Sequence, residues 1–105
     1  MGRRKSIKEK LKDFKKNLNK KIQIKEMILF GSRANGKSRK NSDVDLIIVS
    51  PEFKNLDFFQ RGAKMYDFWD LDLPVDFLCY TPEEFENLKN RASIVREAEK
   101  SGIVI

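Results

Sequence analysis

The sequence predicts one small α/β domain of the mixed α+β kind, in which a small mixed β-sheet is flanked by helices. Helical periodicity and short apolar runs alternate along it, in the order helix, strand, loop, strand, helix, strand, helix. No repeat, linker or low-complexity tract divides the 105 residues, a length that suits one modest core. We therefore expect a single domain over 1–105, with a basic N-terminal helix in 1–21 and the core of the domain in 22–105.

The first element is expected to be an amphipathic helix. Ser6 followed three residues later by Glu9 is a capping-box signature for a helix start. Apolar residues then recur at steps of three and four, at Ile7, Leu11, Phe14 and Leu18. The pattern breaks within residues 17–21, and a strand is expected over 22–30, strongest from Glu26 onward.

Two more strands are expected in the middle of the chain. Residues 31–42, GSRANGKSRKNS, form a polar segment with room for one helical turn. Residues 43–49, DVDLIIV, are typical of a strand buried on both faces, and Ser50-Pro51 ends it. Pro74 precedes a third strand, VDFLCY, over 75–80.

Two helices are expected around that third strand. Aromatic and small side chains at helical spacing predict the first over 56–69. Thr81-Pro82 with Glu84 three residues after the cap predicts the start of the second. Its apolar pattern continues without a break toward Ala98, Gly102 ends it, and the final IVI is a candidate short strand.

The net charge of +6 is unevenly distributed. Residues 1–25 hold 11 basic and 2 acidic residues, whereas the remainder holds 11 basic and 14 acidic residues. The basic segment is either a patch for nucleic acid or another polyanion, or the solvated face of a helix. The second interpretation is favoured because no aromatic residues lie among the polar ones to stack bases.

The residues that are missing exclude several kinds of chemistry. Without histidine, catalysis by Ser-His-Asp or Cys-His groups and His-type zinc sites are excluded. The single cysteine, Cys79, lies in an apolar run and is expected to be a reduced core residue of a cytoplasmic protein. No apolar run is long enough to span a membrane, and no signal peptide is expected.

An acidic pair opens the second predicted strand, although aspartate is depleted in strands. Because side chains alternate, Asp43 and Asp45 are expected on one face, with Val44 and Leu46 on the other. Two carboxylates this close repel each other unless a cation or protons compensate. Oxygen ligands favour Mg²⁺ or Mn²⁺.

The stretch LFGSRANG, residues 29–36, ends the first predicted strand in a small polar corner. Gly31 would let a phosphate approach the backbone, and Ser32 would add a hydroxyl group and the amides of a short helix start. Arg33 adds positive charge. Each feature has a plainer explanation, a simple turn or a solvated strand start, but their combination indicates a polyphosphate–metal site.

A third carboxylate, Asp76, is embedded in the third predicted strand. If this strand neighbours the one that carries Asp43 and Asp45, the three acids can share a metal site. Asp70 and Asp72 also alternate, but no Gly-Ser corner precedes them, so we interpret them as turn and boundary residues.

The motif Phe30-Gly31-Ser32, ten residues and then Asp43-Val44-Asp45-Leu46 resembles the signature of the DNA polymerase beta-like nucleotidyltransferase superfamily. The string LFGSRANGKSRKNSDVDL is most similar to the minimal nucleotidyltransferases of bacteria and archaea. Asn35 stands where that family often has a second arginine, so no phosphate contact is assigned to it.

This resemblance implies the nucleotidyltransferase fold and transfer of a nucleoside monophosphate from an NTP, ATP by preference, onto a hydroxyl group, with release of pyrophosphate. It implies two Mg²⁺ or Mn²⁺ ions on Asp43 and Asp45, and Asp76 as a ligand and proton acceptor on the acceptor side. Gly31 and Ser32 would then bind the β- and γ-phosphates.

The resemblance also implies a helical partner of the HEPN type, which the chain would adenylylate as the antitoxin of a toxin–antitoxin pair. Two alternatives stay open: a non-catalytic module of the same fold that neutralises a partner by contact, and a nucleic-acid binder that uses the basic N-terminal helix. The acceptor and the oligomeric state, including a homo-oligomer, are left undetermined by the sequence.

Overall fold

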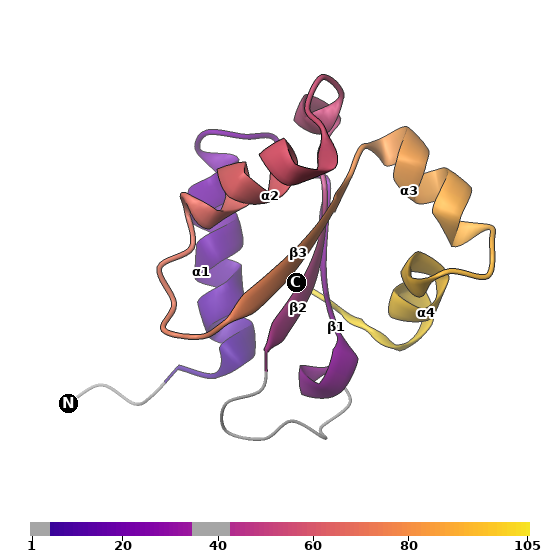
Figure 1. Cartoon of the computed structure of the whole chain (residues 1–105). Helices are drawn as coiled ribbons and strands as arrows, with labels where there is room; N and C mark the ends of the chain where they lie inside the picture. The colour runs from indigo at the N-terminus through magenta and orange to yellow at the C-terminus, as the bar shows by residue number, and fades with distance from the viewer. Residues whose placement is uncertain (1–4, 35–42) are drawn as a thin grey trace.

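Four strands form one mixed sheet in the computed structural model, which describes residues 5–34 and 43–105 (Figure 1). The strand order is β3-β2-β1-β4, and the strands are β1 (Glu26–Phe30), β2 (Val44–Val49), β3 (Val75–Tyr80) and β4 (Ile103–Val104). The pairs β1–β2 and β1–β4 are antiparallel, whereas β2 and β3 are parallel. The predicted mixed sheet and the short final strand are confirmed.

Helices cover both faces of this sheet, so the domain has three layers (Figure 1). On one face α1 (Ile7–Asn19) and α2 (Phe58–Tyr66) pack against the side chains of β2 and β3 that point toward them. On the other face α3 (Pro82–Lys89) and α4 (Ile94–Ser101) bury a second, smaller cluster. Ile47 and Val49 point into this smaller cluster, while Leu46 and Ile48 point into the larger one, as expected for a strand buried on both faces.

The basic N-terminal helix packs its apolar side on the domain. The Ser6 hydroxyl accepts a hydrogen bond from the Glu9 amide, and the Ser6 amide donates to the Glu9 carboxylate, so the predicted capping box is formed. Leu11, Phe14 and Leu18 are buried, and the Phe14 ring meets Trp69 edge-to-face at 4.9 Å. The apolar face is therefore core, and the lysines of the opposite face are exposed to solvent.

The first strand is shorter than the sequence predicts. Residues 22–25 connect α1 to β1, and the Ile22 amide donates to the Leu18 carbonyl and the Ile24 amide to the Asn19 side chain. Contact with β2 begins at Lys25, whose amide donates to the Val49 carbonyl. Both isoleucines are nevertheless buried, which explains the strand-like pattern. The helix predicted over 56–69 is also shorter, because Asp57 forms a capping box with Gln60 and so starts α2 at Phe58.

The prediction of one continuous C-terminal helix was wrong. The structure has two helices, because Ser93 starts a new one by accepting from the Arg96 amide, while its hydroxyl donates to the Leu88 carbonyl at 2.7 Å. The break lets Phe85 on α3 and Val95 on α4 reach the same core cluster. Gly102 ends α4, as predicted.

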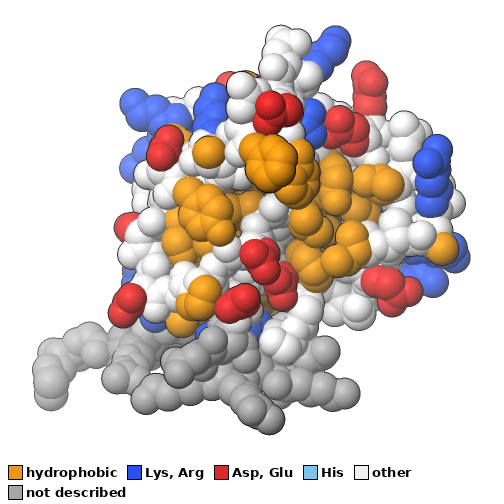
Figure 2. Space-filling view, in the orientation of Figure 1, with side chains coloured by type: hydrophobic (Ala, Val, Ile, Leu, Met, Phe, Trp, Pro, Cys, Tyr) orange, Lys and Arg blue, Asp and Glu red, His pale blue; other side chains and the backbone are white. Residues whose placement is uncertain are grey.

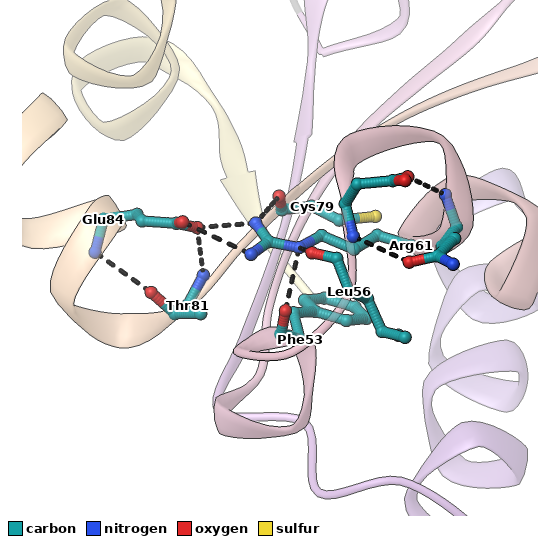
Figure 3. A network of polar contacts seen from close by, with 8 residues as sticks. Phe53, Leu56, Arg61, Cys79, Thr81 and Glu84 are labelled. Atoms are coloured by element: carbon teal, nitrogen blue, oxygen red, sulfur yellow. Dashed lines mark hydrogen bonds and ion pairs between the residues drawn. The ribbon is translucent and has the colours of Figure 1, made fainter.

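A buried arginine joins η2 (Pro51–Phe53), α2, β3 and α3 (Figure 3). The Arg61 Nε donates to the carbonyls of Phe53 and Leu56, at 3.0 and 2.9 Å, and Nη1 donates to the Cys79 carbonyl at 3.2 Å. Nη1 also lies 2.6 Å from the Glu84 carboxylate. A single guanidinium group thereby ties η2, α2, β3 and α3 together at one end of β3.

This arrangement predicts an acid-sensitive contribution to stability. The hydrogen bond from Arg61 holds the pKa of Glu84 below its ordinary value. A lowered folded-state pKa means that Glu84 contributes stability above its unfolded-state pKa and loses it as the pH falls through the folded value. We expect Glu84→Gln to be less stable than the parent at neutral pH and to match it more closely in acid. Urea unfolding at several pH values tests this, with Glu86→Gln, an exposed i,i+3 partner of Lys89, as control. A pH-independent difference between Glu84→Gln and the parent would contradict it.

Cys79 is buried and forms no disulfide, as the sequence indicates for a core thiol. Burial raises the pKa of its thiol to about 12, so the thiolate is scarce at neutral pH in the folded chain. Cys79 therefore serves as an internal reporter of folding in the variants below. Within the two described segments, no helix is long and apolar enough to cross a membrane.

Candidate functional site

The corner after β1 is a single turn of 3-10 helix, η1 (Gly31–Arg33), as the sequence allows. Gly31 has φ = +78°, in the left-handed region that favours glycine. A Cβ added to Gly31 would lie 2.4 Å from Oδ2 of Asp45. The sequence predicts a bare corner to admit a phosphate, and the structure adds a second reason: the Asp45 carboxylate packs directly against the Gly31 backbone.

Ser32 and Arg33 are half-buried in the same turn. The turn is closed by a hydrogen bond from the Ala34 amide to the Gly31 carbonyl, at 3.1 Å. Phosphate binding by Gly31, Ser32 and Arg33 stays a prediction. Asn35 and the remainder of the spacer before Asp43 lie outside the described residues.

The predicted acids come together through strand pairing. Asp45 pairs with Phe30 of β1 on one side and with Asp76 of β3 on the other. Because paired residues of neighbouring strands point to the same face, Asp45 and Asp76 lie side by side. Asp43 is exposed and directly precedes β2, while Val44 is fully buried on the opposite face from Asp45. The condition set by the sequence, that the two acidic strands be neighbours, is met.

The electrostatics of Asp45 reflect this crowding. Burial raises the pKa of its carboxyl group, and the charges of Asp76 and then Asp43 raise it further. The ionised form is therefore disfavoured unless a cation approaches. All the donors here are carboxylate oxygens, the ligands that Mg²⁺ and Mn²⁺ prefer, so the residues fit such an ion.

The three acids are nevertheless not assembled as a ready-made metal centre. Across residues 5–34 and 43–105, no three His, Cys, Asp or Glu side chains are placed so that they could hold one metal ion. Oδ2 of Asp45 lies against Gly31. Metal binding by Asp43, Asp45 and Asp76 thus stays a prediction, and it requires these side chains to move toward a shared ion.

Two hollows flank the acids, and the sequence did not indicate either. One, of about 230 Å³, lies between Gly31 and helix α4, where Ile94 and Glu97 line it. The other, of about 340 Å³, lies between Asp76 and the exposed aromatic residues of α2. The adjacent pair Phe58-Phe59 was the available signal for the second, but it was used only to predict a helix. Larger hollows of about 460 and 480 Å³ lie beside α1 and around Arg61, away from the acids.

The other alternating acids behave as predicted. Asp70 and Asp72 lie in the connection between α2 and β3 and belong to no helix or strand. They therefore provide a matched comparison for the pair at Asp43 and Asp45.

Gly31→Ala is expected to destabilise the fold by about 1–3 kcal/mol, because alanine is strained at a positive φ and its Cβ would displace Asp45. It should also weaken ATP binding. Gly62→Ala is the control, because a Cβ at Gly62 meets no atom within 4 Å and helix propensity improves. Urea unfolding measures the stability of both variants. If Gly31→Ala were as stable as the parent, the close contact with Asp45 would be wrong.

The comparisons with known proteins agree with this geometry. Residues 7–105 match the family model for the nucleotidyltransferase domain. Over 77 residues, the chain is 42% identical to a protein of Haemophilus influenzae named a probable protein adenylyltransferase, MntA. The aligned region covers 69% of this chain and 66% of that protein, so the chain spans just under two thirds of the relative's length.

Solved structures show the same fold. A structure from Sulfolobus solfataricus, named as a nucleotidyltransferase, has a TM-score of 0.64 at 22% identity and covers 99% of this chain and 89% of its own. A chain from the structure of a toxin–antitoxin with AMP-PNP has a TM-score of 0.57 at 21% identity, covering 89% of this chain and 69% of its own. Since the family model spans all but the first residues of the sequence, this chain belongs to the nucleotidyltransferase domain family.

Proposed function

We propose that this chain is a metal-dependent nucleotidyltransferase that moves AMP from ATP onto a hydroxyl group of a partner protein. The observation that carries the proposal is the row Gly31, Asp45 and Asp76, which strand pairing places side by side in a chain of this family. A glycine corner next to paired carboxylates suits a triphosphate with its counter-ions.

In this reaction the acceptor oxygen forms a bond to the α-phosphorus of ATP, the bond from that phosphorus to the bridging oxygen breaks, and pyrophosphate leaves. Asp76 takes the proton of the acceptor hydroxyl. Asp43 and Asp45 would hold two Mg²⁺ or Mn²⁺ ions, and these ions would supply positive charge to stabilise both the attacking and the leaving oxygen. The protein mainly positions groups, which is why so few side chains suffice.

The remaining predicted residues act on the leaving group. Gly31 leaves the backbone accessible to the β- and γ-phosphates, Ser32 offers a hydroxyl, and Arg33 adds positive charge near the phosphate oxygens. Their position next to Asp45 supports this assignment, because the phosphates and the carboxylates need a shared counter-ion.

The partner that we propose is a helical protein of the HEPN type, with this chain as the antitoxin of the pair in the cytoplasm. The resemblance of the motif supports the HEPN type. The name of the Haemophilus influenzae relative supports a protein as the acceptor, and the toxin–antitoxin structure with the same fold supports a partner of that class. Neutralisation by contact alone is the rival outcome.

Mass spectrometry of the purified HEPN-type partner distinguishes AMP transfer from neutralisation by contact alone. After incubation with this chain, ATP and Mg²⁺, the partner should gain the mass of one or more AMP groups, and neutralisation should require ATP. A partner that is neutralised without ATP and keeps its mass would exclude the transfer reaction.

A further inference from the structure

A groove lined by aromatic side chains runs beside Asp76. Phe58, Phe59 and Tyr66 of α2 form one wall, and Asp76 and Phe77 of β3 form the other; we call this the aromatic groove. Its volume is about 340 Å³, enough for one or two large side chains. Figure 2 shows apolar side chains around a central acidic group on this face of the molecule.

The wall of the groove is more exposed than a core requires. Phe59 is 83% exposed, and Phe58 and Tyr66 are more than half exposed, although α2 already buries Met65 and Arg61. Apolar patches of this kind mark interaction sites more often than single exposed residues do. The exposed rings of α2 are therefore available to a partner.

The groove is fixed on the side of Tyr66. The Tyr66 hydroxyl donates to the Val75 carbonyl, and the Tyr66 ring packs edge-to-face on Phe77 with centroids 5.0 Å apart. Phe58 and Phe59 meet edge-to-face at 6.0 Å. The fixed Tyr66 ring lowers the entropic cost of binding on its side of the groove.

The surroundings of the groove are acidic. Asp76 lines the groove, strand pairing places Asp45 beside it, and the exposed Asp43 lies two residues before Asp45. Arg61 of α2 is buried in its ion pair with Glu84, and no lysine or arginine of the described segments lines the groove. Charge complementarity therefore favours an occupant that carries lysine or arginine, and disfavours a nucleic-acid strand.

We propose that the aromatic groove binds the acceptor polypeptide, as a segment with an apolar side chain in the groove and basic side chains against the acidic rim. The assignment of this segment as the acceptor rests on the proposed function, because Asp76 is both a wall of the groove and the proposed proton acceptor. Binding here places a hydroxyl group of the segment next to Asp76 while the triphosphate lies at Gly31.

The test begins with selection of peptides from a random library on the parent chain without ATP. We expect enrichment of peptides that combine aromatic or large aliphatic residues with lysine and arginine. A selected peptide is then synthesised with a fluorescent label, and its affinity is measured by anisotropy. Phe59→Asp should weaken its binding at least about tenfold, the scale of a lost aromatic anchor, whereas Phe59→Leu should retain most of it.

Val104→Asp is the matched control. Val104 is an exposed apolar residue, 61% accessible, on β4 at the edge of the sheet opposite β3. The Val104→Asp substitution should leave the affinity for the selected peptide unchanged. Loss of Cys79 protection in any variant would reveal unfolding rather than a local effect.

Several results would overturn the inference. Absence of enrichment, enrichment of acidic peptides, or equal affinity of Phe59→Asp and the parent would each do so. A lower ATP affinity in Phe59→Asp would indicate that the groove binds the adenine base of ATP. A dimeric parent and a monomeric Phe59→Asp variant would indicate that the groove is an interface between two copies of this chain. Peptide binding that depends on Phe59 in a chain that transfers no AMP would instead contradict only the proposed reaction.

Discussion

The double variant Asp43→Asn/Asp45→Asn is expected to lose metal-dependent ATP binding and to transfer AMP slower by on the order of 10³-fold or more, since removal of even one group that stabilises transition-state charge costs 10²–10³-fold. The physical reason is that the variant removes two of the three carboxylates that are predicted to hold the ions. Burial and neighbouring charges raise the pKa of Asp45, so the ligand-free fold gains nothing from this carboxylate being ionised.

Calorimetry of ATP with Mg²⁺ measures the binding, with Asp70→Asn/Asp72→Asn as the matched control. That pair has the same spacing and the same change of charge, but lies in the connection between α2 and β3. The control should bind like the parent. If the Asp43/Asp45 variant stays folded and binds ATP with Mg²⁺ as tightly as the control, the two acids hold no metal.

Asp76→Asn is expected to separate binding from chemistry. Nucleotide affinity should stay within a few-fold of the parent, because the corner at Gly31 and the pair at Asp43 and Asp45 can hold the triphosphate and its ions. Transfer should fall by on the order of 10²-fold or more, the scale of a lost proton acceptor. A contact made only in the transition state lowers turnover without changing ground-state binding.

Single-turnover transfer and equilibrium ATP binding, measured on the same preparation, test this separation. Asp72→Asn controls for the loss of one negative charge near the α2–β3 connection. If affinity and transfer fall by the same factor, Asp76 belongs to the nucleotide site. If neither falls, Asp76 has no part in the reaction.

Much of the site could be predicted from the sequence because its motifs lie within short segments of the chain. Alternation along one strand places Val44 opposite Asp45, and the FGS motif marks the corner whatever the surrounding fold. The neighbouring position of Asp76 followed from two acidic strands only on the condition that they pair, and the parallel β2–β3 ladder meets that condition.

Contacts between segments distant in the sequence could not be predicted in the same way. The packing of Asp45 against Gly31 depends on the antiparallel register of β1 and β2, which pairs Phe30 with Asp45. Arg61 has the sequence environment of an exposed helical arginine, and only the carbonyls of Phe53 and Cys79 reveal why it is buried. The helix break at Ser93 was missed because the apolar pattern runs through it.

The central claim is that Gly31, Asp43, Asp45 and Asp76 form one site for nucleotidyl transfer. Parallel reactions with ATP labelled at the α- or at the γ-phosphorus, with Mg²⁺ and the purified HEPN-type partner, test it most directly. Label from the α-position should appear on the partner, label from the γ-position should appear only in pyrophosphate, and the Asp43→Asn/Asp45→Asn variant should transfer neither. Label on the partner from the γ-position, or α-label transfer that survives in that variant, would contradict the claim.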